Sequence, residues 1–371
     1  MTIETTRTDP ATAIIPEPTA TREPTDARDP HLRLTKLFDP GTLRPLSPND
    51  AVGASVAGGL VHGMTTIAFC TDGSRQGGAV GLAEADRIAG AIDMAVLEGC
   101  PVVGLWHCGG AKLSDGVEAL HGFAKIFAAT TAASGRIPQI SLILGPAAGG
   151  AAYGPALTDV VVMAQKGKVF VTGPDIVRSV TGEEIDAEGL GGREAHGRKS
   201  GVAHVVTDSE ESAYAHTRAL TSLLGDRRGY DPALVGAAER DLRELLPDNP
   251  RRVYGVHPII TAVLDDVGDH SFEELQPRWA PNVVVGLGRL AGGTVGVVAN
   301  NPLRRGGCLD SVSAEKASRF VRMCDALGIP LLVIVDVPGY LPGVEQEWGG
   351  VVRRGAKLLY AFSEAVVPRV T

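Results

Sequence analysis

The sequence is poor in aromatic residues and in cysteine, and it contains no long uninterrupted apolar run. Only 5% of its 371 residues are Phe, Trp or Tyr. The five cysteines include no CxxC pair, so they indicate neither a disulfide framework nor a zinc ribbon, and they fit a reducing compartment. There is no signal-peptide pattern and no apolar run of about 18 residues, so we expect a cytoplasmic protein with no membrane partner.

Basic residues are not in excess either. The formal net charge is −8, which argues against a nucleic-acid partner. Hydrophobic residues make up 44% of the chain, enough for a substantial core. A chain of this length typically forms about two domains.

Common catalytic signatures are missing. We find no P-loop, no HExxH and no GxSxG pattern. Residues 286–291 fit GxGxxA, but a strand pattern follows them where a dinucleotide site requires a helix. Several histidines are scattered along the chain and read better as surface or core residues than as a metal set, so we expect no metal. They are His62, His107, His121, His196 and His204.

Glycine, by contrast, is abundant, with 47 residues, and one glycine-rich stretch dominates the pattern. A β-rich run from Ile140 ends at Gly145-Pro146, and small residues then lead through Gly149 and Gly150 to Tyr153. A helix that begins at these glycines would present free N–H groups to a negative oxygen. Such groups form an oxyanion hole without any catalytic side chain. The alternative is a glycine-rich turn packed closely on a sheet.

Strand and helix patterns alternate through the first half of the chain, which is typical of an α/β fold with a parallel component. The predicted helices include residues 31–39, 82–97, 116–133 and 209–225, and strands are predicted over 52–70 and 102–106. We expect residues 1–29 to be a disordered tail and residues 165–208 to hold glycine-rich loops and short strands. A polar stretch at 226–258 is the best linker candidate, which divides the chain into domains at 30–250 and 251–371.

The two halves of the sequence repeat each other. Gly99-Cys-Pro101 matches Gly328-Ile-Pro330, an offset of 330 − 101 = 229 residues. Further glycines, an acidic residue and a methionine match at the same offset without a gap. Two copies of one fold explain this better than chance similarity. Because the chain stops three residues after Pro368, we expect the second copy to be cut short before its own glycine turn.

Several motifs together resemble the carboxyltransferase (β) subunit of biotin-dependent acyl-CoA carboxylases. Among its members, the chain resembles the actinobacterial acetyl-/propionyl-CoA carboxylase β chains. The matching runs are residues 109–120, 137–159, 171–175, 188–192, 200–204, 307–310, 336–343 and 349–361. The resemblance implies an α/β fold of two tandem crotonase-like domains (the ClpP/crotonase superfamily), the second truncated at its C-terminus.

The resemblance also implies the activity: carboxybiotin would donate its carboxyl group to the α-carbon of acetyl-CoA or propionyl-CoA, giving malonyl-CoA or methylmalonyl-CoA for fatty acid and related lipid synthesis. The biotin would be carried by a separate biotin carboxylase/biotin carrier (α) subunit, and the chain would form a homo-oligomer, a hexamer. The first domain would bind the acyl-CoA, and the second domain of a neighbouring subunit would present the biotin.

The resemblance places the site residues as follows. The acyl-side oxyanion hole would be Gly149, Gly150 and Ala151. The acyl-CoA contacts would be Gly109, Gly110, Ala111, Lys112 and Tyr153, and the biotin-side pocket would be Pro338, Gly339, Tyr340 and Trp348.

Two residues depart from the family pattern: Lys112 stands where many relatives carry Arg, and Trp348 where Tyr is common. Stabilising a thioester enolate is the main chemical task, which explains the lack of an acid–base set. Two other functions stay open: a biotin-dependent acyl-CoA decarboxylase subunit, and a non-catalytic assembly subunit that docks a biotin carrier.

Overall fold

A computed structural model describes residues 26–371, except residues 227, 235–240, 250–251 and 269. The helices are α1 (Pro30–Leu37), α2 (Leu82–Glu98), α3 (Val117–Ala133), α4 (Gly150–Leu157), α5 (Pro174–Thr181), α6 (Ala187–Gly191), α7 (Glu210–Gly225), α8 (His257–Val263), α9 (Ser311–Ala326), α10 (Val344–Trp348) and α11 (Val351–Glu364). Short 3₁₀ turns are η1 (Gln76–Gly78), η2 (Leu113–Asp115), η4 (Pro232–Leu234), η5 (Leu242–Leu245) and η6 (Arg305–Gly307), and η3 (Ala195–Ser200) is a π-helix.

The strands are β1 (Arg44–Pro45), β2 (Ala54–Val61), β3 (Met64–Thr71), β4 (Val102–Cys108), β5 (Gln139–Ala148), β6 (Val160–Met163), β7 (Lys168–Phe170), β8 (Val205–Val206), β9 (Phe272–Leu275), β10 (Val283–Leu290), β11 (Gly293–Asn300), β12 (Leu331–Ile334) and β13 (Arg369–Val370).

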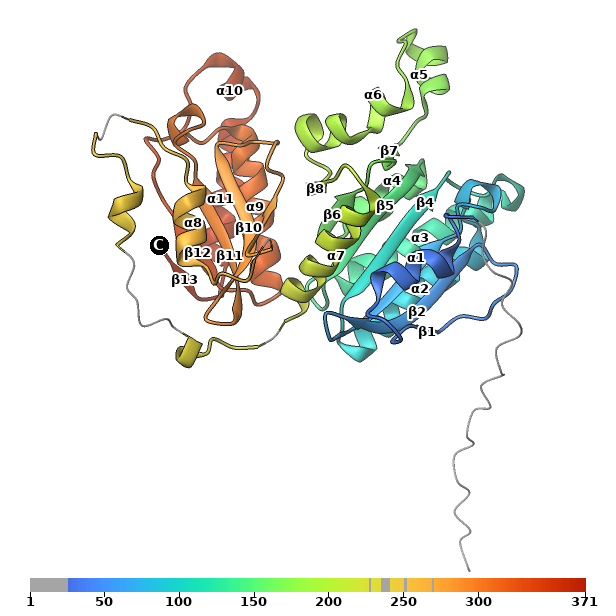
Figure 1. Cartoon of the computed structure of the whole chain (residues 1–371). Helices are drawn as coiled ribbons and strands as arrows, with labels where there is room; N and C mark the ends of the chain where they lie inside the picture. The colour runs from blue at the N-terminus through green and yellow to red at the C-terminus, as the bar shows by residue number, and fades with distance from the viewer. Residues whose placement is uncertain (1–25, 227, 235–240, 250–251, 269) are drawn as a thin grey trace, which may run out of the picture.

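Within the described residues, these strands form two separate sheets (Figure 1). The first has the order β1-β2-β3-β4-β5-β6-β8, with β7 pairing beside β5, and the second has the order β13-β12-β11-β10-β9. Each contains an antiparallel hairpin followed by parallel neighbours, β2–β3–β4–β5 in one and β10–β11–β12–β13 in the other. The predicted α/β class is therefore confirmed.

The predicted repeat is present in the backbone. Strands β2 and β3 match β10 and β11 residue for residue at an offset of 283 − 54 = 229. The repeat extends to positive φ angles at residues other than glycine, which rarely adopt them. His62 (48°) matches Ala291 (47°), and Gln76 (46°) matches Arg305 (52°). Such a conformation costs energy for a residue with a Cβ, so its recurrence at equivalent positions indicates one backbone design used twice.

Helix α2 illustrates how the local sequence builds an element. Its apolar residues recur at helical spacing and bury one face, including Ala85, Ile88 and Ile92. At its start the Glu84 carboxylate accepts the N–H of Gly81 at 3.0 Å, and at its end Gly99 takes the left-handed conformation (φ 62°).

The helices cover both sheets in layers. Helices α2 and α3 pack on one face of the first sheet, while α1 and α7 cover its other face. Helix α7 also contacts β9 and β10 of the second sheet, so it lies between the two sheets (Figure 1). One apolar core therefore runs from β5 through Leu220 and Leu224 of α7 to Val285 of β10 and Phe320 of α9. Helix α8 covers the opposite face of the second sheet.

Three sequence predictions need correction. Residues 165–208 contain helices α5 and α6 and a π-helix as well as loops and short strands. Strand β5 does not end at Gly145-Pro146 but continues to Ala148, because β7 pairs with Pro146, Ala147 and Ala148. Of the predicted tail, residues 1–25 lie outside the described residues. Residues 26–29 are part of the fold, because the Asp29 carboxylate caps α1 by accepting the N–H of His31 at 2.8 Å.

Among the described residues, no helix is both long and apolar enough to cross a bilayer. The predicted cytoplasmic location stays a prediction.

Candidate active site

The candidate site begins where β5 meets α4. Gly149 stands at the junction with a φ of 61°, a conformation that glycine adopts without strain. Gly150 starts the helix, and a Cβ added there would lie 3.1 Å from the ring of Phe123 on α3. The backbone path thus requires the first glycine, and packing requires the second.

Only part of the predicted oxyanion hole has N–H groups without a hydrogen-bond partner in the described residues. The N–H of Gly149 already donates to the carbonyl of Phe170 at 3.0 Å, and the carbonyl of Gly149 accepts from Ala152 at 3.0 Å. Within the described part of the chain, the N–H groups of Gly150 and Ala151 make no hydrogen bond. They are the first two donors of α4, where the helix dipole favours a negative oxygen.

The predicted acyl-CoA loop lies directly against this junction. Gly110 has a φ of 117°, and a Cβ there would lie 3.3 Å from the carbonyl oxygen of Ala148. Its position is held by Val80, whose N–H donates to the Gly110 carbonyl and whose carbonyl accepts from Lys112, both at 2.9 Å. Two glycine-rich loops that are 40 residues apart in sequence, 150 − 110 = 40, therefore meet at one end of the first sheet.

Tyr153 lies on the next turn of α4. Its side chain is half exposed, and its ring packs edge-on against Phe127 of α3 with 6.4 Å between centroids. The tyrosine therefore borders the junction and stays accessible to a ligand.

The predicted biotin-side residues occupy the equivalent place on the second sheet. The carbonyl of Gly339 accepts from the N–H of Leu309 at 3.0 Å, and Leu309 in turn accepts from Leu341 at 2.7 Å. This is the Val80–Gly110–Lys112 arrangement displaced by 339 − 110 = 229 residues. Trp348 ends α10 and is 86% exposed, and Tyr340 is 41% exposed. Nothing lies within 4 Å of the place where a Gly339 Cβ would stand, so the loop leaves room for a bulky ring beside these aromatic faces.

The two groups belong to different sheets, and no backbone hydrogen bond joins them within the described chain.

Comparison with known proteins shows the family to which this chain belongs. A model described as the carboxyl transferase domain matches residues 41–371. The chain is also 58% identical over 354 residues to the biotin-dependent acetyl-/propionyl-coenzyme A carboxylase beta6 subunit of Mycobacterium tuberculosis, covering 95% of this chain and 74% of that protein. The chain belongs to the carboxyl transferase family.

Further matches agree with this. The propionyl-CoA carboxylase beta chain of Rhodococcus erythropolis is 56% identical over 354 residues, again covering 95% of this chain and 74% of that protein. A solved structure of transcarboxylase 12S, described as a hexamer with hydrolysed methylmalonyl-coenzyme A bound, matches with a TM-score of 0.85 at 36% identity, over 91% of this chain and 71% of that one. The predicted family and its crotonase-like carboxyltransferase fold are confirmed, and the domain boundaries and site residues stay predictions.

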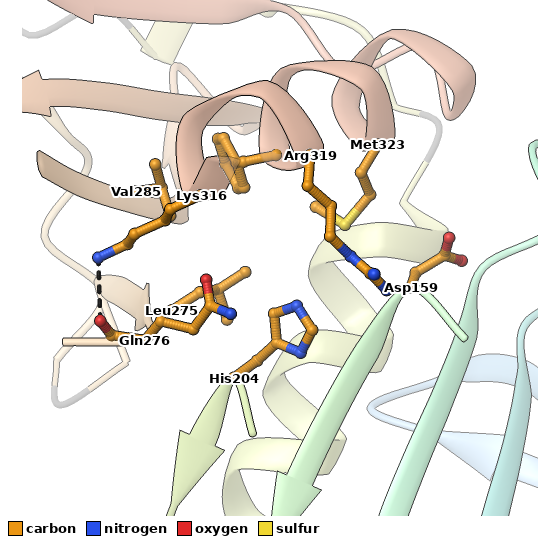
Figure 2. A pocket seen from close by; sticks show the side chains of 9 residues that line it. Asp159, His204, Leu275, Gln276, Val285, Lys316, Arg319 and Met323 are labelled. Carbon is orange, nitrogen blue, oxygen red and sulfur yellow. Dashed lines mark hydrogen bonds between the residues drawn. The ribbon is translucent and has the colours of Figure 1, made fainter. Parts of the chain in front are cut away.

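A polar network that no sequence pattern indicated joins the two sheets of this carboxyltransferase (Figure 2). The guanidinium of Arg319 on α9 donates to the carbonyl of Thr158, at the end of α4, at 3.0 Å. Nearby, the buried ammonium of Lys316 donates to the carbonyls of Gln276 at 2.9 Å and Trp279 at 3.1 Å. Burial lowers the pKa of Lys316 to about 7. In the sequence these two basic residues look like part of the exposed polar face of a helix, so no local pattern indicates that they are buried or bonded.

Asp159 and His204 face the same interface from the first sheet (Figure 2). The Asp159 carboxylate accepts the N–H of Gln139 at 2.8 Å, and burial raises its pKa to about 6. The space enclosed among these side chains is only about 10 Å³, about the size that a single water needs. The network therefore fastens α4 and its neighbours to the second sheet and does not form a ligand pocket.

His204 makes the stability of this carboxyltransferase dependent on pH. Its Nδ1 accepts the N–H of Val161 at 3.0 Å, and burial lowers its pKa to about 3. Below pH 6.5 the unfolded chain binds a proton here that the folded chain does not, so stability falls as the pH decreases. We expect His204 alone to lower the free energy of unfolding by about 1.5 kcal/mol between pH 6.5 and 5.

A His204→Asn variant retains an acceptor for Val161 but cannot titrate. Urea unfolding of both proteins across this pH range should show that the free energy of unfolding depends less on pH in the variant. The contributions of the other titrating groups are common to both proteins and cancel when the two free energies are subtracted. Parallel profiles would contradict the assignment.

Proposed function

We propose that this carboxyltransferase moves a carboxyl group from carboxybiotin to the α-carbon of acetyl-CoA or propionyl-CoA, giving malonyl-CoA or methylmalonyl-CoA for fatty acid and related lipid synthesis. The observation that carries this proposal is the pair of free N–H groups at Gly150 and Ala151, set against the Gly110 loop. The names of the relatives, an acetyl-/propionyl-CoA carboxylase subunit and a propionyl-CoA carboxylase chain, support the choice of substrates.

The chain's own residues supply an electrostatic mechanism. Removing a proton from the α-carbon of a thioester places negative charge on the carbonyl oxygen, and the N–H groups of Gly150 and Ala151 would stabilise that charge. Gly149 contributes its backbone conformation, since its own N–H is already bonded to Phe170. Carboxybiotin supplies the carboxyl group, and a biotin nitrogen can serve as the base, so no side-chain base is required.

Other residues would bind and orient the substrates. The residues from Gly109 to Lys112, together with Tyr153, would hold the acyl-CoA on the unit formed by residues 30–250. Many relatives carry Arg at the position of Lys112. Lysine offers a single ammonium charge there in place of a bidentate guanidinium. Pro338, Gly339, Tyr340 and Trp348 would receive the biotin on the unit formed by residues 251–371.

We propose that the partners are a biotin carboxylase/biotin carrier (α) subunit and further copies of this chain in a hexamer. The acyl-side and biotin-side groups lie on different sheets, and no backbone hydrogen bond joins them in the described residues, which supports a complete site that combines two copies. The hexamer described for transcarboxylase 12S provides a precedent for such an assembly.

The proposal is tested by a carboxylation assay with the complete chain, a biotinylated α subunit, ATP and radioactive bicarbonate. We expect acid-stable label in product from acetyl-CoA and propionyl-CoA, and a lower rate from butyryl-CoA. Carrier binding without affinity for any of these thioesters would instead indicate an assembly subunit. Sodium-dependent release of CO₂ from the carboxylated products would indicate a decarboxylase.

A further inference from the structure

A cluster of three side chains of metal-ligating types joins α7 to β9, elements that carry none of the candidate active-site residues. His216 belongs to α7 of the first unit, His270 precedes β9, and Glu273 lies on β9 of the second sheet. One ligand atom from each residue lies within 4.8 Å of the other two. No sequence pattern groups these residues, because 54 positions, 270 − 216 = 54, separate the two histidines.

The two imidazoles converge on opposite oxygens of one carboxylate. Nδ1 of His216 lies 2.7 Å from Oε2 of Glu273, and Nδ1 of His270 is in hydrogen-bond contact with Oε1. The two rings are nearly perpendicular, at 89°, with 5.5 Å between their centroids. Two nitrogen ligand atoms and one oxygen ligand atom, from α7 and from the segment that leads into and includes β9, thus lie within 4.8 Å of one another.

Charge at this place also favours a cation. The Glu273 side chain is only 3% exposed, and among the described residues the basic groups within ion-pair distance of its carboxylate are these two histidines, each charged only when protonated. A buried carboxylate with no Lys or Arg partner gains from a positive charge in contact with it. Arg218, two residues along α7 from His216, donates instead to Asp39 and to the carbonyl of Leu37.

The donor set selects the class of metal. Two imidazoles and one carboxylate match Zn²⁺ and neighbouring transition ions, and they are a poor match for Mg²⁺ or Ca²⁺, which prefer oxygen. Three protein ligands leave a fourth position for water. The histidine side chains are 32% and 41% exposed, so an ion can reach them from solvent.

We propose that His216, His270 and Glu273 bind one divalent transition metal ion, with zinc the best match, and that the ion fastens α7 to β9. The ion would displace the two ring protons that now lie between the histidines and Glu273. Since the cluster joins a helix of the first unit to a strand of the second, the ion would stabilise their docking and take no part in carboxyl transfer.

The adjacent strand residue provides a matched control. Nε2 of His257 lies 2.9 Å from Oε2 of Glu274, in a histidine–glutamate pair whose side chains are 45% and 20% exposed. No third donor joins that pair in the described chain, so it lacks the chelate needed for tight binding. His257→Ala therefore removes an equivalent hydrogen bond without touching the proposed site.

The experiment is titration of the chelator-treated complete chain with zinc chloride alone, followed by calorimetry. We expect one zinc site. His216→Ala or His270→Ala should lower its affinity at least about tenfold, because removing a metal ligand weakens binding no less than removing a residue that hydrogen-bonds to a ligand. Glu273→Gln should weaken binding as well, whereas His257→Ala should bind as the unsubstituted chain does. Cobalt chloride should give visible absorption bands of a nitrogen-ligated ion that disappear in the His216→Ala variant.

Thermal unfolding provides a second measurement that does not depend on activity. Zinc should raise the midpoint for the unsubstituted chain and for His257→Ala, but not for His270→Ala, whose partly exposed side chain can be removed without unfolding the protein. The proposal would be overturned if zinc binding were not saturable, or if the His216 and His270 variants bound zinc as tightly as the unsubstituted chain. The three residues would then only link α7 to β9 by hydrogen bonds.

Discussion

Replacing Gly150 with valine is expected to lower the turnover of the assembled carboxyltransferase by about 100-fold or more, the usual cost of losing one donor from an oxyanion hole. The Cβ alone would stand 3.1 Å from the Phe123 ring, and valine adds two further methyl groups. Phe123 is only 3% exposed, so its ring cannot move aside freely. The start of α4 must therefore shift, and the N–H groups of Gly150 and Ala151 shift with it.

The effect should fall on kcat more than on the affinity for acyl-CoA, because the lost interaction is strongest with the enolate. Gly90→Val is the matched control: Gly90 also lies in a helix, α2, but nothing stands within 4 Å of its Cβ position. Steady-state rates of carboxyl transfer compare the two variants. Normal turnover in Gly150→Val would show that these N–H groups do not act in the reaction.

Replacing Trp106 with alanine is expected to lower the free energy of unfolding by about 3–5 kcal/mol, as for other large-to-small changes in a core. Trp106 on β4 is 1% exposed and packs edge-on against Phe69 with 5.2 Å between ring centroids. On its other side it supports α4: a Cβ on Gly154 would lie 2.8 Å from the indole. The cavity left by alanine would therefore open directly beneath the candidate oxyanion helix.

Trp106→Phe separates packing from hydrogen bonding. It keeps most of the ring but loses the indole N–H, which donates to Oγ of Ser141 at 3.0 Å, so we expect a loss of about 1 kcal/mol. Urea unfolding of the three proteins at one pH measures both differences. A loss from alanine no greater than that from phenylalanine would mean that the site collapses around the missing ring and that α4 is supported elsewhere.

Local patterns were sufficient to predict the longer helices and strands of the first half of the fold. Helix α2 was predicted over residues 82–97 and is observed at Leu82–Glu98, because its apolar spacing and the glycine after it are local signals. The predictions failed where a distant partner decides the structure. Strand β5 continues through Pro146 because β7 supplies a neighbour there, and residues 165–208 form short helices that apolar periodicity does not reveal.

The candidate site likewise has features that local sequence predicted and one that only the fold reveals. The sequence identified Gly149, Gly150 and the Gly110 loop as glycine-rich turns after strands, but it treated all three N–H groups from Gly149 to Ala151 as available. The bond from Gly149 to Phe170 is made across two strands, and so only the folded chain reveals it.

The sequence by itself determined the repeated unit, because each copy carries its own strand alternation, helix spacing and turn glycines, and these act within a few residues along the chain. Only the tertiary structure decided how the copies meet. The burial of Lys316 and the convergence of His216 and His270 on Glu273 depend on the docking of α7 and α9 between two sheets. Such contacts join residues tens of positions apart, and the packing of side chains in the shared core sets their distances, which no local pattern encodes.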